Sequence, residues 1–166
     1  LIISTTGYLS LSELGTRGGI GRFINYYIGK KREGMLSGII STAMGMFFAS
    51  ALFLIPAALI LGWGFNSLYP ITTDITQNTI AISLGLATLN LWLGFMCSPF
   101  TQLLTARHRF DIYNAINLLA IAVRAFGTMF VLARGGGLVS LAAVQVLSSG
   151  VALILSYIVA MQFYPS

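Results

Sequence analysis

The sequence predicts an all-α polytopic transmembrane helix bundle of about five helices. Of its 166 residues, 57% are hydrophobic and 8% are charged, whereas an average soluble domain carries roughly a quarter charged residues. Asp, Glu, Lys and Arg are missing from residues 34–73, 75–106 and 135–166, and about 20 apolar residues suffice to cross a bilayer. These observations exclude a soluble globular enzyme, a disordered segment and a nucleic-acid-binding domain, although the net charge is +5.

The first element is a helix end within residues 1–28, which we expect to run into a basic cytoplasmic segment. Its Glu13 and Arg17 lie four positions apart, one helical turn, and can pair. The chain begins with Leu rather than Met, inside an apolar run without a basic flank. We therefore expect it to be a segment of a longer, transporter-sized protein.

Four further spans are predicted at residues 36–62, 79–104, 112–132 and 138–163, with a polar, Pro-containing loop at 65–77. Pro56 and Pro99 should kink or loosen their helices. The span 112–132 is apolar except for Asn114, Asn117 and Arg124. On an insertion scale its Arg costs about 2.5–3.5 kcal/mol, and each Leu, Ile, Val or Phe returns about 0.3–0.6. Neighbouring helices are therefore expected to shelter it.

The distribution of basic residues predicts the orientation. Five lie between positions 17 and 32, none in the loop 65–77, two in the loop 105–111, and Arg134 alone in the next turn. Because cytoplasmic loops of membrane proteins carry an excess of Lys and Arg, the segments 17–35 and 105–111 are predicted to be cytoplasmic.

Small residues predict which helix faces pack, because helices in a bilayer associate through close approach of small side chains. Residues spaced by four on the span 36–62 are Ser37, Ser41, Gly45 and Ala49, and those on the span 138–163 are Ser148, Ala152, Ser156 and Ala160. We expect both faces to form helix–helix contacts.

Polar residues form two other stripes. The span 79–104 aligns Asn90, Gly94, Ser98 and Gln102, and the span 112–132 aligns Asn114, Asn117, Arg124 and Thr128. Polar faces in a membrane must meet protein or water. The stripes therefore predict either a shared hydrophilic cavity or a set of interhelical hydrogen bonds, each worth about 0.6–2 kcal/mol.

Arg124 is the residue most suggestive of function, because it lies deep in its span. A buried Arg is either half of an ion pair, here with Glu13, or a receptor for an anion such as phosphate; a contact outside this chain is the third reading. A single Cys and a single His exclude a disulfide scaffold and a Cys/His metal site, and no cofactor is expected.

The order of loops and charges resembles a known family. The run GYLSLSELGTRGGIGRFINYYIGKKREGMLSGIIST, residues 7–42, is similar to the signature of polysaccharide-unit flippases of the multidrug/oligosaccharidyl-lipid/polysaccharide exporter superfamily. The matching residues are Glu13, Leu14, Gly15, Arg22 and Phe23. LLTARHRFDIYNAIN, residues 103–117, resembles the loop between helices four and five of that family, and Arg124 and the Gly turn at 135–137 also fit.

The resemblance implies that residues 1–166 run from the tail of helix two through helix six and form most of the N-terminal lobe. The whole protein would have two lobes, with twelve to fourteen helices, in a bacterial or archaeal cytoplasmic membrane. Such a protein moves undecaprenyl-pyrophosphate-linked oligosaccharides across the bilayer by alternating access, for polysaccharide biosynthesis. Its implied partners are that lipid-linked substrate, the bilayer, a coupling ion (H⁺ or Na⁺) and other polysaccharide-assembly membrane proteins. The candidate cavity residues are Arg124, Asn117, Asn114, Asn90, Gln102, Arg17, Arg22 and Glu13.

Three alternatives stay open. A cation-coupled antiporter for drugs or organic cations would need buried carboxylates, and Glu13 is the one candidate here. A non-transporting scaffold subunit would lack the polar stripes and tolerate replacement of Arg124. A membrane enzyme is least favoured, because only Glu13, Asp74, His108 and Asp111 could serve as acids or bases.

Overall fold

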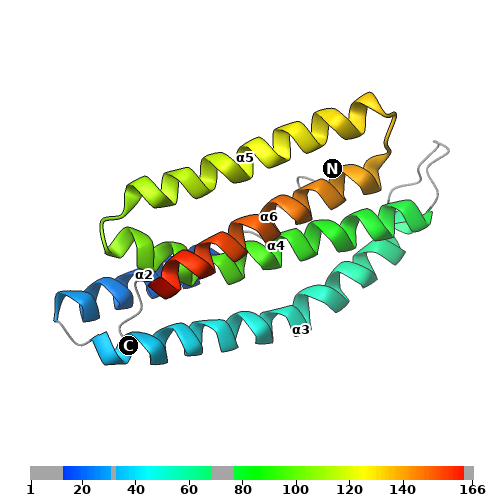
Figure 1. Cartoon of the computed structure of the whole chain (residues 1–166). Helices are drawn as coiled ribbons and strands as arrows, with labels where there is room; N and C mark the ends of the chain where they lie inside the picture. Colours follow the sequence, from blue (N-terminus) through cyan, green and yellow to red (C-terminus); the bar gives the residue numbers. More distant parts are fainter. Residues whose placement is uncertain (1–12, 31–32, 69–76, 163–166) are drawn as a thin grey trace.

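The structure, a computed structural model, describes residues 13–30, 33–68 and 77–162, and this part of the chain is all-helical (Figure 1). Its five α-helices and one short 3₁₀ helix confirm the all-α prediction. They are α2 (Glu13–Gly29), η1 (Glu33–Met35), α3 (Leu36–Leu68), α4 (Gln77–Ala106), α5 (Phe110–Ala133) and α6 (Leu138–Gln162).

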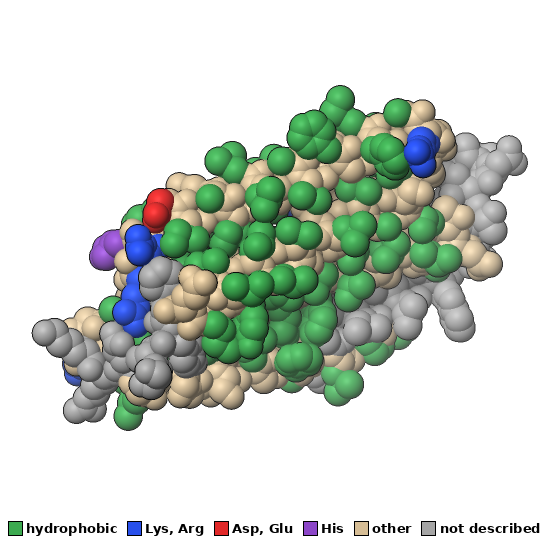
Figure 2. Space-filling model, viewed as in Figure 1, with side chains coloured by type: hydrophobic (Ala, Val, Ile, Leu, Met, Phe, Trp, Pro, Cys, Tyr) green, Lys and Arg blue, Asp and Glu red, His purple; other side chains and the backbone are tan. Residues whose placement is uncertain are grey.

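Three of the described helical segments are long and apolar enough to cross a membrane: Asn78–Ala106, Phe110–Ala133 and Leu138–Gln162. A shorter apolar segment, Leu36–Ser50, opens α3. Rows of hydrophobic side chains also cover the face of the molecule shown in Figure 2. These features indicate a multi-pass membrane protein.

The end of α3 was predicted wrongly. The helix continues to Leu68, past the predicted end at residue 62, so residues 65–68 of the predicted loop are helical; residues 69–76 lie outside the described part. Glycine within a helix costs only about 1 kcal/mol relative to Ala, so Gly62 and Gly64 do not end it.

Both predicted proline sites lie inside continuous helices, Pro56 in α3 and Pro99 in α4. The second half of α3, which contains Pro56, runs at an angle to the first half (Figure 1). Proline removes one backbone hydrogen bond and crowds the preceding turn, which accounts for such a change of direction.

Helix α4 is the centre of the bundle and packs against α6, α3 and α2, while α5 lies outermost and packs mainly against α6 (Figure 1). The buried apolar side chains around α4 form two clusters. One contains Ile24, Leu36, Ile40, Phe100, Leu103 and Ala160. The other contains Ala43, Phe47, Phe95 and Met96, and the Phe47 and Phe95 rings stack with centroids 5.9 Å apart.

The small-residue face of α6 packs as predicted. Ser148, Ser156 and Ala160 are buried. The Ser148 hydroxyl donates to the Ala120 carbonyl of α5 at 2.7 Å, and the Cys97 thiol of α4 lies 3.4 Å from Ser156 Oγ. This face therefore joins α6 to both of its neighbours.

The small-residue face of α3 does not pack against another described helix, which contradicts the prediction. Ser37, Ser41, Gly45 and Ala49 are exposed. The side that meets α4 and α2 instead carries Leu36, Ile40, Ala43 and Phe47, all buried. Small residues permit close approach of another helix, but larger side chains bury more area against the aromatic residues of α4.

The helix connections divide the charged residues unevenly between the two ends of the bundle. The α2–α3 and α4–α5 connections lie at one end of the bundle, and the α5–α6 connection lies at the other (Figure 1). Most of the Lys, Arg, Asp and His side chains visible in Figure 2 gather at the first end. Lys30, Arg107 and Arg109 belong to those two connections, and Arg134 to the opposite one.

Close approach of α5 and α6 at Gly127 gives a test of this packing. A Cβ at Gly127 would lie 2.7 Å from Val144 Cγ1, so Gly127→Ala should lower the free energy of unfolding by about 1–3 kcal/mol through overpacking. Val144→Ala removes the clashing methyl groups. The double variant should therefore lose less unfolding free energy than the two single variants lose together. Thermal unfolding of the four proteins in detergent measures this coupling, and simple additivity would contradict the α5–α6 contact.

Candidate functional site

The polar stripe of α5 lies beside the face that packs against α6. Ile116, on that packed face, is buried, whereas Asn114 and Arg124 are exposed. Asn117 is partly buried and donates from Nδ2 to the Tyr113 carbonyl one turn earlier, at 3.1 Å. Within the described chain, the side chains of Asn114 and Arg124 are therefore exposed on the surface of α5.

Arg124 lies nine positions before Ala133, the last residue of α5, which corresponds to about 14 Å along the helix axis. It is thus somewhat closer to the end that carries Arg134 than to the basic end. This depth is still about half of the roughly 30 Å hydrocarbon core. A guanidinium at this depth needs an anionic or polar partner.

No described carboxylate pairs with Arg124. Asp111 lies at the beginning of α5, where one of its oxygens is 3.9 Å from Arg109 Nη1. The predicted alternative partner, Glu13, begins α2, but its side chain lies outside the described part. Helices α2 and α5 do not pack against each other in the described chain, so helix packing gives the Glu13–Arg124 pair no support.

The polar stripe of α4 is used largely for contacts between helices. Asn90 Oδ1 accepts a 2.6 Å hydrogen bond from the Ser149 hydroxyl of α6. Gln102 lies against α2, where a Cβ added to Gly21 would be 2.8 Å from its Oε1. Ser98 is buried. Of these residues, Asn90 follows the interhelical hydrogen-bond interpretation, whereas the buried Ser98 hydroxyl has no hydrogen-bond partner among the described residues.

Arg22, a candidate on α2, is exposed. The side chains of Arg17 and Glu13 lie outside the described part, so the structure gives them no position. Among the residues that are described, no group of three or more His, Cys, Asp or Glu side chains is arranged to hold a metal ion.

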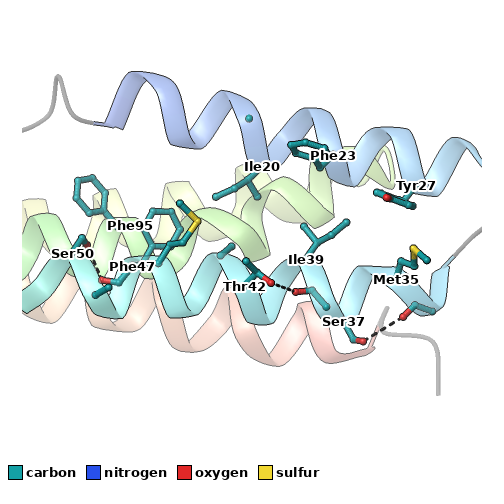
Figure 3. Close-up of a pocket in the computed structure, with 16 residues that line it drawn as sticks. Ile20, Phe23, Tyr27, Met35, Ser37, Ile39, Thr42, Phe47, Ser50 and Phe95 are labelled. Carbon is teal, nitrogen blue, oxygen red and sulfur yellow. Dashed lines mark hydrogen bonds between the residues drawn. The ribbon is translucent and has the colours of Figure 1, made fainter.

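A pocket of about 1120 Å³ lies between α2 and α3 (Figure 3). Its walls include Ile20, Phe23 and Tyr27 of α2, and Ile39, Met46 and Phe47 of α3. None of the candidate cavity residues whose side chains are described lines it. This pocket thus does not bring the α4 and α5 stripes together.

Reasoning from the sequence missed this apolar groove. A signal was present, because Ile20, Phe23 and Tyr27 recur at steps of three and four, the spacing of one helix face. In a sequence that is apolar nearly everywhere, however, such a face does not stand out from the lipid-facing positions around it.

Comparisons with protein-family models, with curated proteins and with solved structures find no match for this chain. The resemblance to the flippases stays a prediction that rests on the residues quoted for it and on the order of the charged loops.

Proposed function

We propose that the chain forms part of the N-terminal lobe of a flippase that moves undecaprenyl-pyrophosphate-linked oligosaccharides across the cytoplasmic membrane. The observation that carries the proposal is the exposed guanidinium of Arg124, deep in an apolar helix and without a described carboxylate partner. Arg is suited to bind phosphate because its planar group donates two parallel hydrogen bonds.

The substrate has three chemically different parts, and the chain offers a surface for two of them. Arg124 would offset the pyrophosphate charge, and Asn114 and Asn117 on the same stripe of α5 would hydrogen-bond sugar hydroxyls. The Asn117 amide now donates to the Tyr113 carbonyl and keeps its side-chain oxygen as an acceptor. The polyprenyl chain would stay in the surrounding lipid.

The remaining wall of the substrate cavity would come from helices that are not described here. α5 lies at the edge of the described bundle and carries exposed side chains along most of its length. Its polar stripe is therefore free to meet another lobe. Asn90 is already bonded to Ser149 and Gln102 lies against Gly21, so we expect these two residues to contribute mainly to helix packing.

Deletion of the full-length gene tests the function in the cell. Loss of surface polysaccharide together with accumulation of undecaprenyl-linked units is the expected result, because a lipid-linked anion with a large polar sugar does not cross hydrocarbon unaided. Unchanged polysaccharide with increased sensitivity to cationic drugs would contradict the proposal and favour the antiporter, in which case Glu13 becomes the residue to test.

The proposed orientation makes a separate prediction. In a Cys97→Ser background, a thiol at His108→Cys should react with a membrane-impermeant maleimide only when the cytoplasmic side is accessible. A thiol at Arg134→Cys should react only from the opposite side, because the two positions lie at opposite ends of α5. Labelling of intact cells and of inverted vesicles distinguishes the two sides; labelling of both thiols from one side would contradict this topology.

A further inference from the structure

The groove between α2 and α3 is lined by apolar side chains that no described helix covers. In Figure 3, Ile20 of α2 points toward α3 and Ile39 of α3 points toward α2. Two other lining residues, Phe23 and Met46, are 61% and 57% exposed. The volume of about 1120 Å³ exceeds the roughly 300–1,000 Å³ typical of small-molecule pockets.

The Ser and Thr hydroxyl groups in the groove do not require a polar ligand. Ser37 donates to the Gly34 carbonyl at 3.4 Å, Thr42 to the Gly38 carbonyl at 2.7 Å, and Ser50 to the Phe47 carbonyl at 2.7 Å. Each of these three hydroxyls is thus bonded to a backbone carbonyl three or four residues earlier (Figure 3). The rest of the groove surface is mainly apolar, and it is suited to a hydrocarbon chain rather than to a sugar or an ion.

One end of the groove is positively charged. Lys30 directly follows the last residue of α2, at the end of the groove that Tyr27, Gly34 and Met35 line. Lys30 lies three positions after Tyr27 and seven after Phe23, so it shares the face of α2 that lines the groove. Its Nζ is 4.5 Å from the centre of the Tyr26 ring, which holds the ammonium at the helix end.

We infer that the groove binds one phospholipid with an anionic headgroup, drawn from the bilayer leaflet at the basic end. Its acyl chains would lie between α2 and α3, and its phosphate would meet Lys30. The charge at the groove end and the apolar walls below it complement such an amphiphile. This lipid differs from the proposed transported substrate, and the inference stands whether or not the chain belongs to a flippase.

Two substitutions test the two halves of the site in the full-length protein. Gly38 lines the groove and has no atom within 4 Å of an added Cβ, so Gly38→Leu should fill the space without a clash. Lys30→Gln removes the charge at its end. One Lys near an anionic surface changes binding by about fivefold, so this is the expected loss of affinity for Lys30→Gln.

Matched controls exist for both variants. Gly45→Leu places the same side chain on α3 at another exposed position with equal space, which does not line the groove. Arg109→Gln removes a charge from the same end of the bundle, but at the α4–α5 connection. Comparison with this second control separates binding in the groove from general attraction to the basic end.

Native mass spectrometry of the detergent-purified protein, with added dioleoylphosphatidylglycerol or dioleoylphosphatidylcholine, measures the binding. We expect the unmodified protein to retain phosphatidylglycerol in preference to phosphatidylcholine. Gly38→Leu should abolish this preference and Lys30→Gln should weaken it, whereas the controls Gly45→Leu and Arg109→Gln should preserve it. Equal retention of the two lipids by the unmodified protein would overturn the inference. Unchanged binding in Lys30→Gln would overturn it as well, even if Gly38→Leu failed to fold.

Discussion

Replacement of Arg124 by Gln in the full-length protein is expected to lower transport of the lipid-linked oligosaccharide by about ten- to hundredfold. The estimate corresponds to the loss of a hydrogen-bonded interaction with a charged group, which is worth about 1.5–3 kcal/mol. Membrane insertion should be preserved, because Gln is tolerated in a membrane helix far better than Arg. Surface polysaccharide and the level of inserted protein, measured together in a complemented deletion strain, give the result.

Two further variants separate the charge of Arg124 from its shape. Arg124→Lys keeps the charge but loses the bidentate geometry, so its activity should lie between that of the unmodified protein and Arg124→Gln. Arg134→Gln removes an exposed Arg just after the end of the same helix, where no contact with substrate is proposed, and should retain transport. Normal transport by Arg124→Gln would contradict the assignment, and loss of inserted protein would favour an ion-pair role for Arg124.

Ser148→Phe is expected to cause the largest loss of stability in the bundle. Ser148 has no exposed surface, and its hydroxyl joins α6 to the Ala120 carbonyl of α5. A Phe ring at this position must force the two helices apart, at a cost of about 1–3 kcal/mol, and it also removes the hydrogen bond. The expected result is a lower Tm of the detergent-purified protein.

Leu147→Phe is the matched control for Ser148→Phe. Leu147 precedes Ser148 in α6 but is 65% exposed, so a ring there meets lipid or detergent. Its Tm should stay close to that of the unmodified protein. Equal Tm values for the two variants would contradict the packing of α6 against α5.

The helices could be predicted because they are determined by the residues of each segment itself. Charge-free stretches and the length needed to cross a bilayer located α4, α5 and α6 to within about two residues at each end. The end of α3 was less predictable, because Gly62 and Gly64 weaken a helix without stopping it. The predicted span stopped at Gly62, whereas the helix is described as far as Leu68.

The partners of the helix faces could not be predicted from one sequence. The stripe with Asn90 looks on a helical wheel like the stripe with Arg124, yet Asn90 bonds to Ser149, while Arg124 is exposed. The small-residue faces of α3 and α6 likewise have the same spacing, and only that of α6 is buried. Periodicity defines a face, but the three-dimensional arrangement of the other helices decides what that face meets.

The most direct test of the proposed function is translocation by the purified full-length protein in proteoliposomes. A fluorescent undecaprenyl-pyrophosphate-linked oligosaccharide is placed in both leaflets, and a membrane-impermeant reagent reports how much remains in the outer one. We predict that the protein exchanges the lipid between leaflets, that Arg124→Gln slows this exchange by about ten- to hundredfold, and that Arg134→Gln leaves it unchanged. Absence of exchange by the unmodified protein, in vesicles where it is inserted and folded, would contradict the account.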